Sequence, residues 1–182
     1  MTVGRDPATV STGAGSLFFA PIGTAEWTTL SGPMTGFVDL GYTEKGVIFT
    51  VGMTTADIDV AEEFYPLATT VLSKTGKLDF ALSQLTAQNL SVANAGGTIT
   101  TPSGYVTFEP PAAGTEARLM LAWQSASGDE RYLWRRCFQT GASATARQKA
   151  LPQALLPVSF NLEKPAGAQP WKWWGSTARS GA

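Results

Sequence analysis

The sequence predicts a mainly β protein of the α+β class, in which one helix flanks antiparallel sheets. Three observations favour this class. Short runs that alternate apolar and polar residues recur along the chain, as expected for half-buried strands. The 19 glycines and 11 prolines separate these runs into short elements, and a single segment shows helical spacing. A chain of 182 residues usually forms one domain, so we expect one mostly antiparallel β domain with the helix against one face.

The first part of the chain is expected to contain an arm and three strands. Residues 1–16 are small, polar and glycine-rich, which favours a flexible N-terminal arm. The β domain is expected to span residues 17–164 and to begin with an apolar strand over Leu17–Ile22. Two further strands, Phe37–Tyr42 and Gly46–Val51, are predicted to be joined by a glycine-flanked turn.

The middle of the chain contains the clearest strand and the predicted helix. Residues 77–83 read KLDFALS, in which leucine and phenylalanine alternate with polar or small residues. Residues Ser83–Ala95 are rich in Ala, Leu and Gln and place apolar residues at helical spacing. Gly96 and Gly97 suit a C-terminal helix cap, so we predict one helix here.

After the helix the pattern returns to strands. Thr98–Thr101 and Tyr105–Phe108 are predicted as short strands around a Pro-Ser-Gly turn. The runs ARLMLAWQS and RYLWRRCFQTG flank a short glycine-containing segment, which indicates a β-hairpin. We expect Trp123 and Trp134 to meet across this hairpin, because aromatic cross-strand pairs stabilise such ribbons. The run LPVSFNLEKP supplies a final alternating strand.

Residues 165–182 are predicted to form a tryptophan-rich C-terminal tail. This segment carries Trp171, Trp173 and Trp174 among Pro, Gly and Ser residues. Exposed tryptophans in a flexible tail are costly unless they dock. We therefore expect them either to fold back on this domain or to bind a neighbouring copy, and the sequence favours neither.

The composition excludes most catalytic chemistry. The chain contains no histidine and one cysteine, Cys137, so histidine-activated nucleophiles and the usual zinc or copper sites are unavailable. Cys137 lies in an apolar run and is expected to be a small buried residue. We therefore predict a binding or structural protein rather than an enzyme, with no cofactor and no metal.

The charge pattern argues against nucleic-acid and membrane binding. The formal net charge is −1 and charged residues make up 15% of the chain, against about 25% in typical domains. Such a surface indicates either burial against neighbouring copies or a Thr/Ser-rich β surface. The one tight basic cluster, Arg131, Arg135 and Arg136, is predicted to form surface ion pairs rather than a phosphate site. No long apolar run or signal-peptide pattern is present, which predicts a soluble protein made in the cytoplasm.

Acidic residues cluster at Asp57, Asp59, Glu62 and Glu63. Asp57 and Asp59 alternate with apolar residues, which places them on one exposed strand face. The spacing does not match a calcium-binding EF-hand loop, so a solvated face is favoured over a calcium site or an acid/base pair. The tryptophan and tyrosine side chains could line a carbohydrate site, although core packing is the commoner role of such residues.

Four segments of the chain carry a family resemblance. They read GSLFFAPIGT, FVDLGYTEKGVIFTV, TTADIDVAEEFYPLATTV and KLDFALSQLTAQNLSVANAGG, and the last follows the order strand, helix and double glycine. With the hairpin region and final strand between Arg118 and Glu163, they resemble the major tail tube proteins of long-tailed bacteriophages, especially siphophages of actinobacterial hosts. The resemblance covers about Gly15 to Pro165 and includes no catalytic motif.

The resemblance implies a fold of two packed antiparallel β-sheets, in a sandwich-like or barrel-like arrangement, flanked by a helix. It further implies that the protein forms hexameric rings, whose sheets join into one barrel, and that rings stack into a hollow tube through which the genome leaves. Implied partners are further copies of the chain and the tape measure, terminator and baseplate proteins, with DNA passing through without specific binding and no membrane contact. The implied location is the virion tail, after synthesis in the cytoplasm of a bacterial host.

The resemblance also assigns roles to particular residues. Family lumens tend to be acidic, and an acidic bore would repel DNA, so Asp57 and Asp59 are the lumen-facing candidates. We expect the segment Val51–Asp59 to form part of a loop that contacts the next ring. Its candidate contact residues are Gly52, Met53, Thr54 and Thr55.

Two other function classes stay open. A different β-sandwich virion protein, such as a tail terminator or a capsid decoration protein, would form single rings or closed trimers instead of open tubes. A carbohydrate-binding β-sandwich module would use Trp123, Trp134 and the tail tryptophans. An enzyme ranks third, because no nucleophile–base pair can be named.

Overall fold

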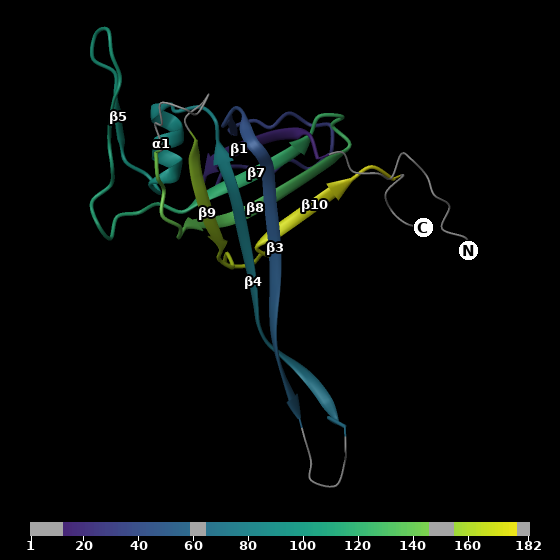
Figure 1. Cartoon of the computed structure of the whole chain (residues 1–182). Coiled ribbons are helices and arrows are strands. Elements are labelled where there is room, and N and C mark those ends of the chain that lie inside the picture. The colour runs from purple at the N-terminus through teal and green to yellow at the C-terminus, as the bar shows by residue number, and fades with distance from the viewer. Residues whose placement is uncertain (1–12, 59–64, 146–154, 178–182) are drawn as a thin grey trace.

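The computed structural model describes residues 13–58, 65–145 and 155–177, which form ten strands and one short helix (Figure 1). The strands are β1 (Gly15–Pro21), β2 (Val38–Asp39), β3 (Thr43–Ile58), β4 (Ala68–Leu82), β5 (Thr98–Thr100), β6 (Thr107–Glu109), β7 (Leu119–Ser125), β8 (Glu130–Gln139), β9 (Leu156–Leu162) and β10 (Trp171–Gly175). The helix is α1 (Ala87–Ala93). Within these residues no helix has the length and apolar character needed to cross a membrane.

Most of these strands belong to one antiparallel sheet. Its order is β2-β1-β7-β8-β9-β4-β3, and β10 also pairs with β8, while β5 and β6 form a separate two-stranded sheet. The large sheet curls until β3 lies opposite β8, where the ring centroids of Phe49 and Trp134 are 5.5 Å apart. The predicted fold class, mainly β with antiparallel sheets and a helix, is confirmed. The two expected layers are largely the two halves of one curled sheet.

The main core lies inside the curl. Alternate residues of β4, namely Leu78, Phe80 and Leu82, point inward and are buried, as the KLDFALS pattern predicted. Phe80 stacks on Phe160 of β9, with ring centroids 5.8 Å apart. These residues join side chains from β1, β7, β8 and α1 in a single cluster. Inward alternation on several strands therefore builds one continuous core.

The helix closes one side of this core and is shorter than predicted. It begins after Thr86, whose hydroxyl accepts a hydrogen bond from the backbone N–H of Asn89 at 3.1 Å. The buried Asn89 side chain donates to the carbonyls of Gln84 (2.7 Å) and Leu40 (3.1 Å), which ties the helix to the strands beside it. The predicted start at Ser83 is wrong because Thr86 caps the helix there. The expected glycine cap is wrong, because Asn94 is the C-cap and Ala95, with a φ of 56°, takes the left-handed position. Gly96 follows and donates its backbone N–H to the Ser91 carbonyl.

A second cluster covers the opposite face of β1, β7 and β8. It contains Ala20, Trp27, Met120, Ala122 and Leu133. Trp27 comes from the connection between β1 and β2 and packs edge-on against a phenylalanine of the same connection. The central strands are therefore buried on both faces, which explains their nearly continuous apolar sequences.

The predicted hairpin between Phe37–Tyr42 and Gly46–Val51 is wrong. β2 pairs with β1, while β3 already begins at Thr43 and pairs with β4. The residues expected to form a turn lie at a register shift within β3, where Gly46 has a positive φ of 77°. A glycine bulge and a glycine turn have the same local sequence signal. The pairing of β3 with β4 makes this segment a bulge rather than a turn.

The β7–β8 hairpin is confirmed, but its predicted tryptophan pair is not. Trp123 lies opposite Tyr132, and Trp134 lies opposite Leu121. A register shift between these strands then allows both Trp134 and Cys137 to enter the core. Cys137 is fully buried, as expected, and its burial raises the pKa of the thiol above its ordinary value.

Candidate assembly surfaces

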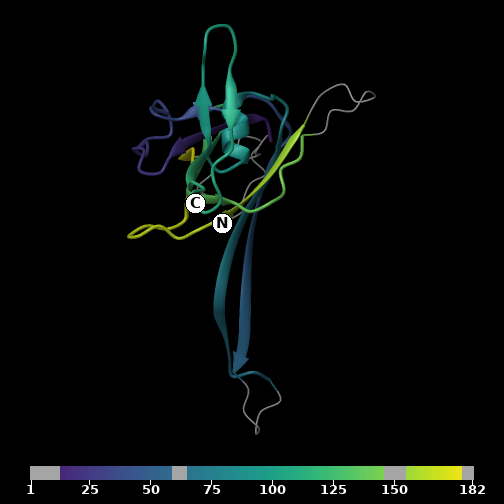
Figure 2. The same ribbon diagram turned by 90° about the vertical axis from the view of Figure 1, so that its left-hand side faces the viewer.

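The longest feature of the domain is the hairpin formed by β3 and β4. Its base belongs to the curled sheet, and its outer part projects well beyond the domain in both views (Figures 1 and 2). The pairing is continuous from Val51 opposite Gly76 to Ile58 opposite Ala68, apart from one register shift. None of the described residues beyond Val51 and Gly76 on this hairpin belongs to either core cluster. The outer hairpin therefore depends on its own strand pairing within the monomer.

The outer hairpin carries apolar side chains that water surrounds. Val51, Met53, Val71 and Leu72 are 50%, 64%, 46% and 66% exposed, and we call them the hairpin apolar cluster. Val51 and Met53 continue the face on which Val47 and Phe49 enter the core. Contiguous exposed apolar side chains of this kind mark interaction surfaces in soluble proteins.

The proposed ring-contact residues all lie on this hairpin. Gly52, Met53, Thr54 and Thr55 are part of strand β3, so the segment expected to be a loop is a strand. A Cβ atom on Gly52 would lie 2.7 Å from the Thr75 hydroxyl, so glycine permits the close cross-strand approach. The loop expectation failed because threonine and glycine are compatible with both a loop and a twisted two-stranded ribbon.

Of the two lumen candidates, Asp57 lies near the far end of the described part of β3. Asp57 is exposed on β3, and the Thr69 hydroxyl of β4 donates a hydrogen bond to its carboxylate at 2.7 Å. Asp59 lies outside the described residues, as do Glu62 and Glu63. The position of Asp57 places a negative charge about as far from the core as the described hairpin reaches.

A cavity of about 480 Å³ lies at the base of the hairpin. Val51 and Met53 line it from β3, Lys74 from β4, and Leu162 and Trp171 from the C-terminal strands. The hairpin apolar cluster therefore continues into a recess bordered by β9 and β10, where the side chains of another molecule could pack.

The tail tryptophans lie on strand β10, which pairs with β8 of the same chain. Trp171 packs against Phe49 at 5.4 Å between ring centroids, and Trp174 packs against Trp27 at 5.1 Å. Trp173 donates its indole N–H to Glu130 at 2.9 Å. Trp171 and Trp173 nevertheless remain 37% and 39% exposed, so the segment both packs on its own domain and presents aromatic surface.

A second, smaller projection is formed by β5 and β6. It leaves the domain at the end away from the long hairpin (Figures 1 and 2). Its exposed large side chains are Ile99, Tyr105 and Val106, set among threonines. The short strands at this position were expected from the sequence, but their separation from the main sheet was not.

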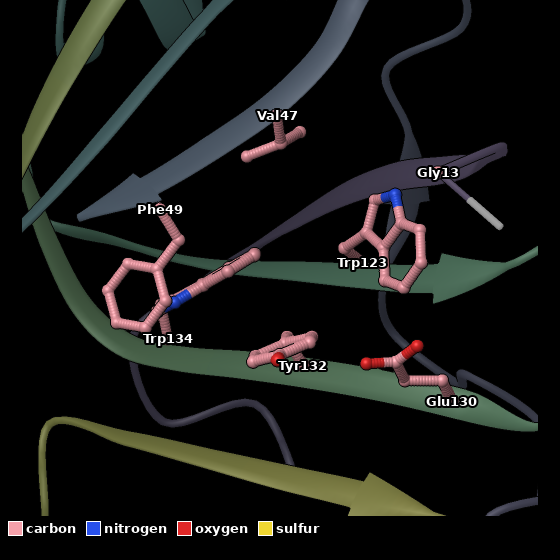
Figure 3. Close-up of a pocket in the computed structure, with 7 residues that line it drawn as sticks. All are labelled: Gly13, Val47, Phe49, Trp123, Glu130, Tyr132 and Trp134. Atoms are coloured by element: carbon pink, nitrogen blue, oxygen red, sulfur yellow. The ribbon is translucent and has the colours of Figure 1, made fainter. Parts of the chain in front are cut away.

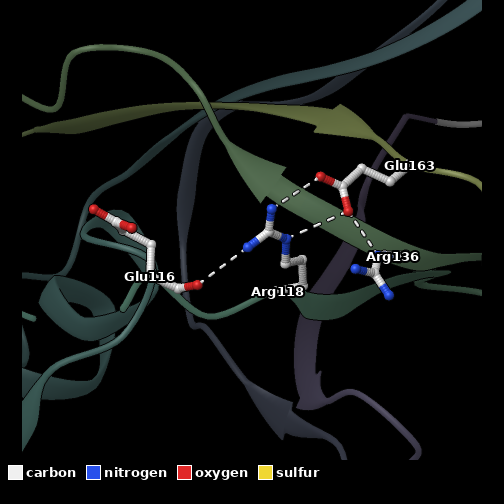
Figure 4. Close-up of polar contacts among 4 residues, drawn as sticks. All are labelled: Glu116, Arg118, Arg136 and Glu163. Carbon is white, nitrogen blue, oxygen red and sulfur yellow. Dashed lines mark hydrogen bonds and ion pairs between the residues drawn. The ribbon is translucent and has the colours of Figure 1, made fainter. Parts of the chain in front are cut away.

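The three arginines of the basic cluster all contact other groups of the same domain. Arg135 donates to Glu26, with one N–O distance of 2.8 Å, and Arg136 donates to Glu163 at 2.6 Å, where Arg118 also binds (Figure 4). The expectation of surface ion pairs fits two of the three arginines. It is wrong for Arg131, which is buried, lies 5.5 Å from the Trp27 ring and donates to a backbone carbonyl. Sequence reasoning missed the acidic partners because they are remote in the chain.

The Glu163 carboxylate gives a testable pH dependence. The hydrogen bond from Arg136 is the largest influence, and with Arg118 it holds the pKa of Glu163 below its ordinary value of 4.5. A depressed folded pKa means that the ion pairs stabilise the fold above the ordinary pKa, and that this contribution is lost as pH falls through the folded pKa. We expect Glu163→Gln to unfold at lower urea than the wild type near neutral pH, with a small difference because the pairs are partly exposed.

This difference is expected to shrink as the pH is lowered from about 6 to values below the ordinary glutamate pKa, because the wild-type carboxylate is protonated as the pH falls through its lowered folded pKa. Urea midpoints of both proteins across this range measure it. Glu44→Gln, at an exposed position on β3, serves as the control substitution. A difference between Glu163→Gln and the wild type that stays constant with pH would rule out the ion pairs as its source.

The fold and its surfaces define a structural subunit with exposed apolar projections. The family profile described as "Phage tail tube protein" matches residues 3–181. The chain therefore belongs to the phage tail tube protein family, and it is a viral structural protein of the phage tail.

The crystal structure of Hcp1 from Salmonella typhimurium is similar with 11% sequence identity and a TM-score of 0.32, and the match covers 91% of this chain and 97% of that one. The comparison with curated proteins found no match.

Proposed function

We propose that this tail tube protein polymerises as hexameric rings that stack into a hollow tube, and that this tube is the conduit for DNA ejection. The observation that carries the proposal is the long β3–β4 hairpin with its exposed apolar cluster. A monomer gains nothing from holding Met53 and Leu72 in water, whereas a neighbouring subunit that covers them gains stability. Burial of a side chain of this size contributes about 1.5–3 kcal/mol, and every subunit in a tube would repeat that gain.

Sheet edges provide the second support for self-assembly. β3 lies at one end of the main sheet and β2 at the other, so both present backbone groups on one side without a neighbouring strand among the described residues. Exposed edges are sites where another chain adds strands. In the proposed ring, edge pairing between subunits closes the sheets into one continuous barrel, and the hairpin apolar cluster packs on the next ring.

The same proposal gives the remaining residues and partners their roles. Asp57 and Asp59 face the lumen, where their charge repels the DNA backbone and keeps it mobile. Growth begins on a baseplate, follows a tape measure protein and ends at a terminator protein. The subunit has no enzymatic activity, binds no membrane, and is made in the cytoplasm of the bacterial host. A siphophage tail and an actinobacterial host remain predictions of the sequence resemblance.

Negative-stain electron microscopy of the purified protein over a concentration series tests the proposal. Hollow tubes of uniform width and regular axial repeat are the expected result. Closed rings or trimers at every concentration would contradict it and favour a terminator or decoration protein. If the protein stays monomeric, addition of tail-tip complexes from the phage should start tube growth. Failure to grow with such an initiator, together with a fluorescence response to glycans, would favour the carbohydrate-binding alternative.

A further inference from the structure

We propose that the recess at the base of the long hairpin receives the far end of the same hairpin from a second copy of this chain. The recess, which we call the base recess, has a volume of about 480 Å³. Its lining includes apolar side chains and two lysines, namely Val51, Met53, Leu162, Trp171, Lys74 and Lys164. This inference rests on the proposed function, because it names the surface of the next subunit that the hairpin contacts.

One wall of the base recess is held in place by the core. Trp171 packs against Phe49 of β3 at 5.4 Å and against Tyr132 of β8 at 6.5 Å between ring centroids. Phe49 in turn meets Trp134 edge-on at 67°, and Figure 3 shows these two rings beside each other. Trp171 nevertheless remains 37% exposed. A partner that packs on this indole therefore meets a side chain that is already ordered, which lowers the entropy cost of binding.

The base recess carries positive charge. Lys74 and Lys164 are both exposed, and neither forms an ion pair with another residue in the described parts of the chain. No acidic side chain is among the described residues that line the recess. The segment that complements this surface combines apolar side chains with carboxylates, because interfaces match charge of opposite sign.

The far end of the long hairpin has this complementary chemistry. Tyr65 and Leu67, which directly precede β4, are 84% and 62% exposed. The sequence places Glu62 and Glu63 shortly before them. In the base recess the tyrosine ring and the leucine side chain would cover apolar lining residues, and a tyrosine face also attracts a lysine ammonium group. The two glutamates would supply carboxylates for the two lysines.

The far end that fills a base recess must come from another copy. Met53 lines the recess, and Ile58 is the last residue of β3, so five further residues extend the strand beyond the recess. At about 3.3 Å per residue they span roughly 17 Å. The two strands stay paired along this length apart from one register shift, and the hairpin points away from the domain (Figures 1 and 2). A contact from the far end of one copy to the base of the next repeats without closing, which is how open filaments grow.

Crosslinking of two single-site variants in assembled tubes tests the inference. Tyr65→Cys places a thiol at the far end of the hairpin, and Gln169→Cys places one in the base recess. The native Cys137 is fully buried and should not react. Mixed tubes of the two variants, treated with a short bismaleimide crosslinker, should give more covalent dimers than tubes of either variant alone.

The matched control replaces Tyr65→Cys by Tyr105→Cys. Tyr105 is also an exposed tyrosine, at 63%, but it lies on the β5–β6 projection, so its mixture with Gln169→Cys should give no such increase. Tubes that assemble but show no more dimers with Tyr65→Cys than with Tyr105→Cys would overturn the inference and leave the proposed function intact. If the wild-type protein forms no tubes even with an initiator, the proposed function is contradicted and the inference fails with it.

Lys164→Glu provides a second measurement that needs no introduced cysteine. It replaces an attraction by a repulsion, so we expect the protein concentration needed for tube formation to rise about tenfold at low salt. Added salt should reduce this difference, because it screens exposed charges. Lys45→Glu makes the same change of charge at an exposed position of β3 outside the recess and should assemble like the wild type. Equal assembly of Lys164→Glu and the wild type at low salt would contradict the inference, even if the cysteine variants do not assemble.

Discussion

A variant in which an Asn-Gly turn joins Val51 directly to Gly76 is expected to fold normally and to form no tubes. These two residues lie opposite each other on β3 and β4, so a two-residue turn can connect them in place of the outer hairpin. All the described residues that would be removed lie outside both core clusters. The domain therefore keeps its buried contacts and loses Met53, Val71 and Leu72 of the hairpin apolar cluster, which is the surface proposed to join successive rings.

Electron microscopy and analytical ultracentrifugation measure the outcome, with circular dichroism to verify the fold. The matched control is a second hairpin deletion, in which an Asn-Gly turn joins Thr100 to Thr107. These residues are opposite partners on β5 and β6, and the proposal gives that projection no part in ring stacking. If the first variant forms tubes of normal length, the long hairpin has no part in assembly. If neither variant forms tubes, the loss is a general effect of shortening a hairpin and not specific to β3 and β4.

The same substitution at two positions of β4 is expected to separate stability from assembly. Leu78 is 0% exposed in the core, and Leu72 is 66% exposed in the hairpin apolar cluster. Leu78→Ala removes buried methyl groups and leaves a cavity, which typically costs about 2–5 kcal/mol. Leu72→Ala should change the free energy of unfolding of the monomer by no more than about 0.5 kcal/mol, yet it should raise the protein concentration needed for tube formation.

Urea unfolding at a concentration too low for tubes measures the first effect, and light scattering across concentrations measures the second. Because both variants lose the same atoms from the same strand, the hydrophobicity of the side chain cannot explain a difference between them. A Leu72→Ala protein that assembles exactly as the wild type would show that this side chain is not covered by a neighbour. A large loss of monomer stability at Leu72 would show that the hairpin contributes to the core after all.

Features of the fold that depend on neighbouring residues could be predicted from the sequence, and features that depend on residues far apart in the chain could not. Leu78, Phe80 and Leu82 were predicted to share a buried face because alternation is a local property of a strand. The β7–β8 hairpin was predicted for the same reason. Pairing of β1 with β7 could not be predicted, because partners about a hundred residues apart leave no mark in either segment. The register between β7 and β8 was also predicted wrongly, because Trp123 lies opposite Tyr132 and not opposite Trp134.

For the functional surfaces, the sequence indicated some of the residues but not the contacts that position them. Met53 and its neighbours were predicted to lie in a loop, and their strand pairing with Lys74 and Ser73 was missed. The contact of Glu130 with Trp173 could not be predicted, because the two residues are 43 positions apart and meet only through the pairing of β8 with β10. The contact between Phe49 and Trp134 depends likewise on the curl of the sheet.

The topology of the main sheet also sets an order of events during folding. The β3–β4 hairpin pairs residues close in sequence, and such hairpins form in about 1–10 μs. Closure of β1 onto β7 joins remote segments, and β domains dominated by non-local pairs take roughly milliseconds to seconds. Each chain therefore passes through an interval in which the β3–β4 hairpin exists before the pairing of β1 with β7 completes the curled sheet. Crowded nascent chains would associate through immature hairpins, so the refolding yield should fall as protein concentration rises.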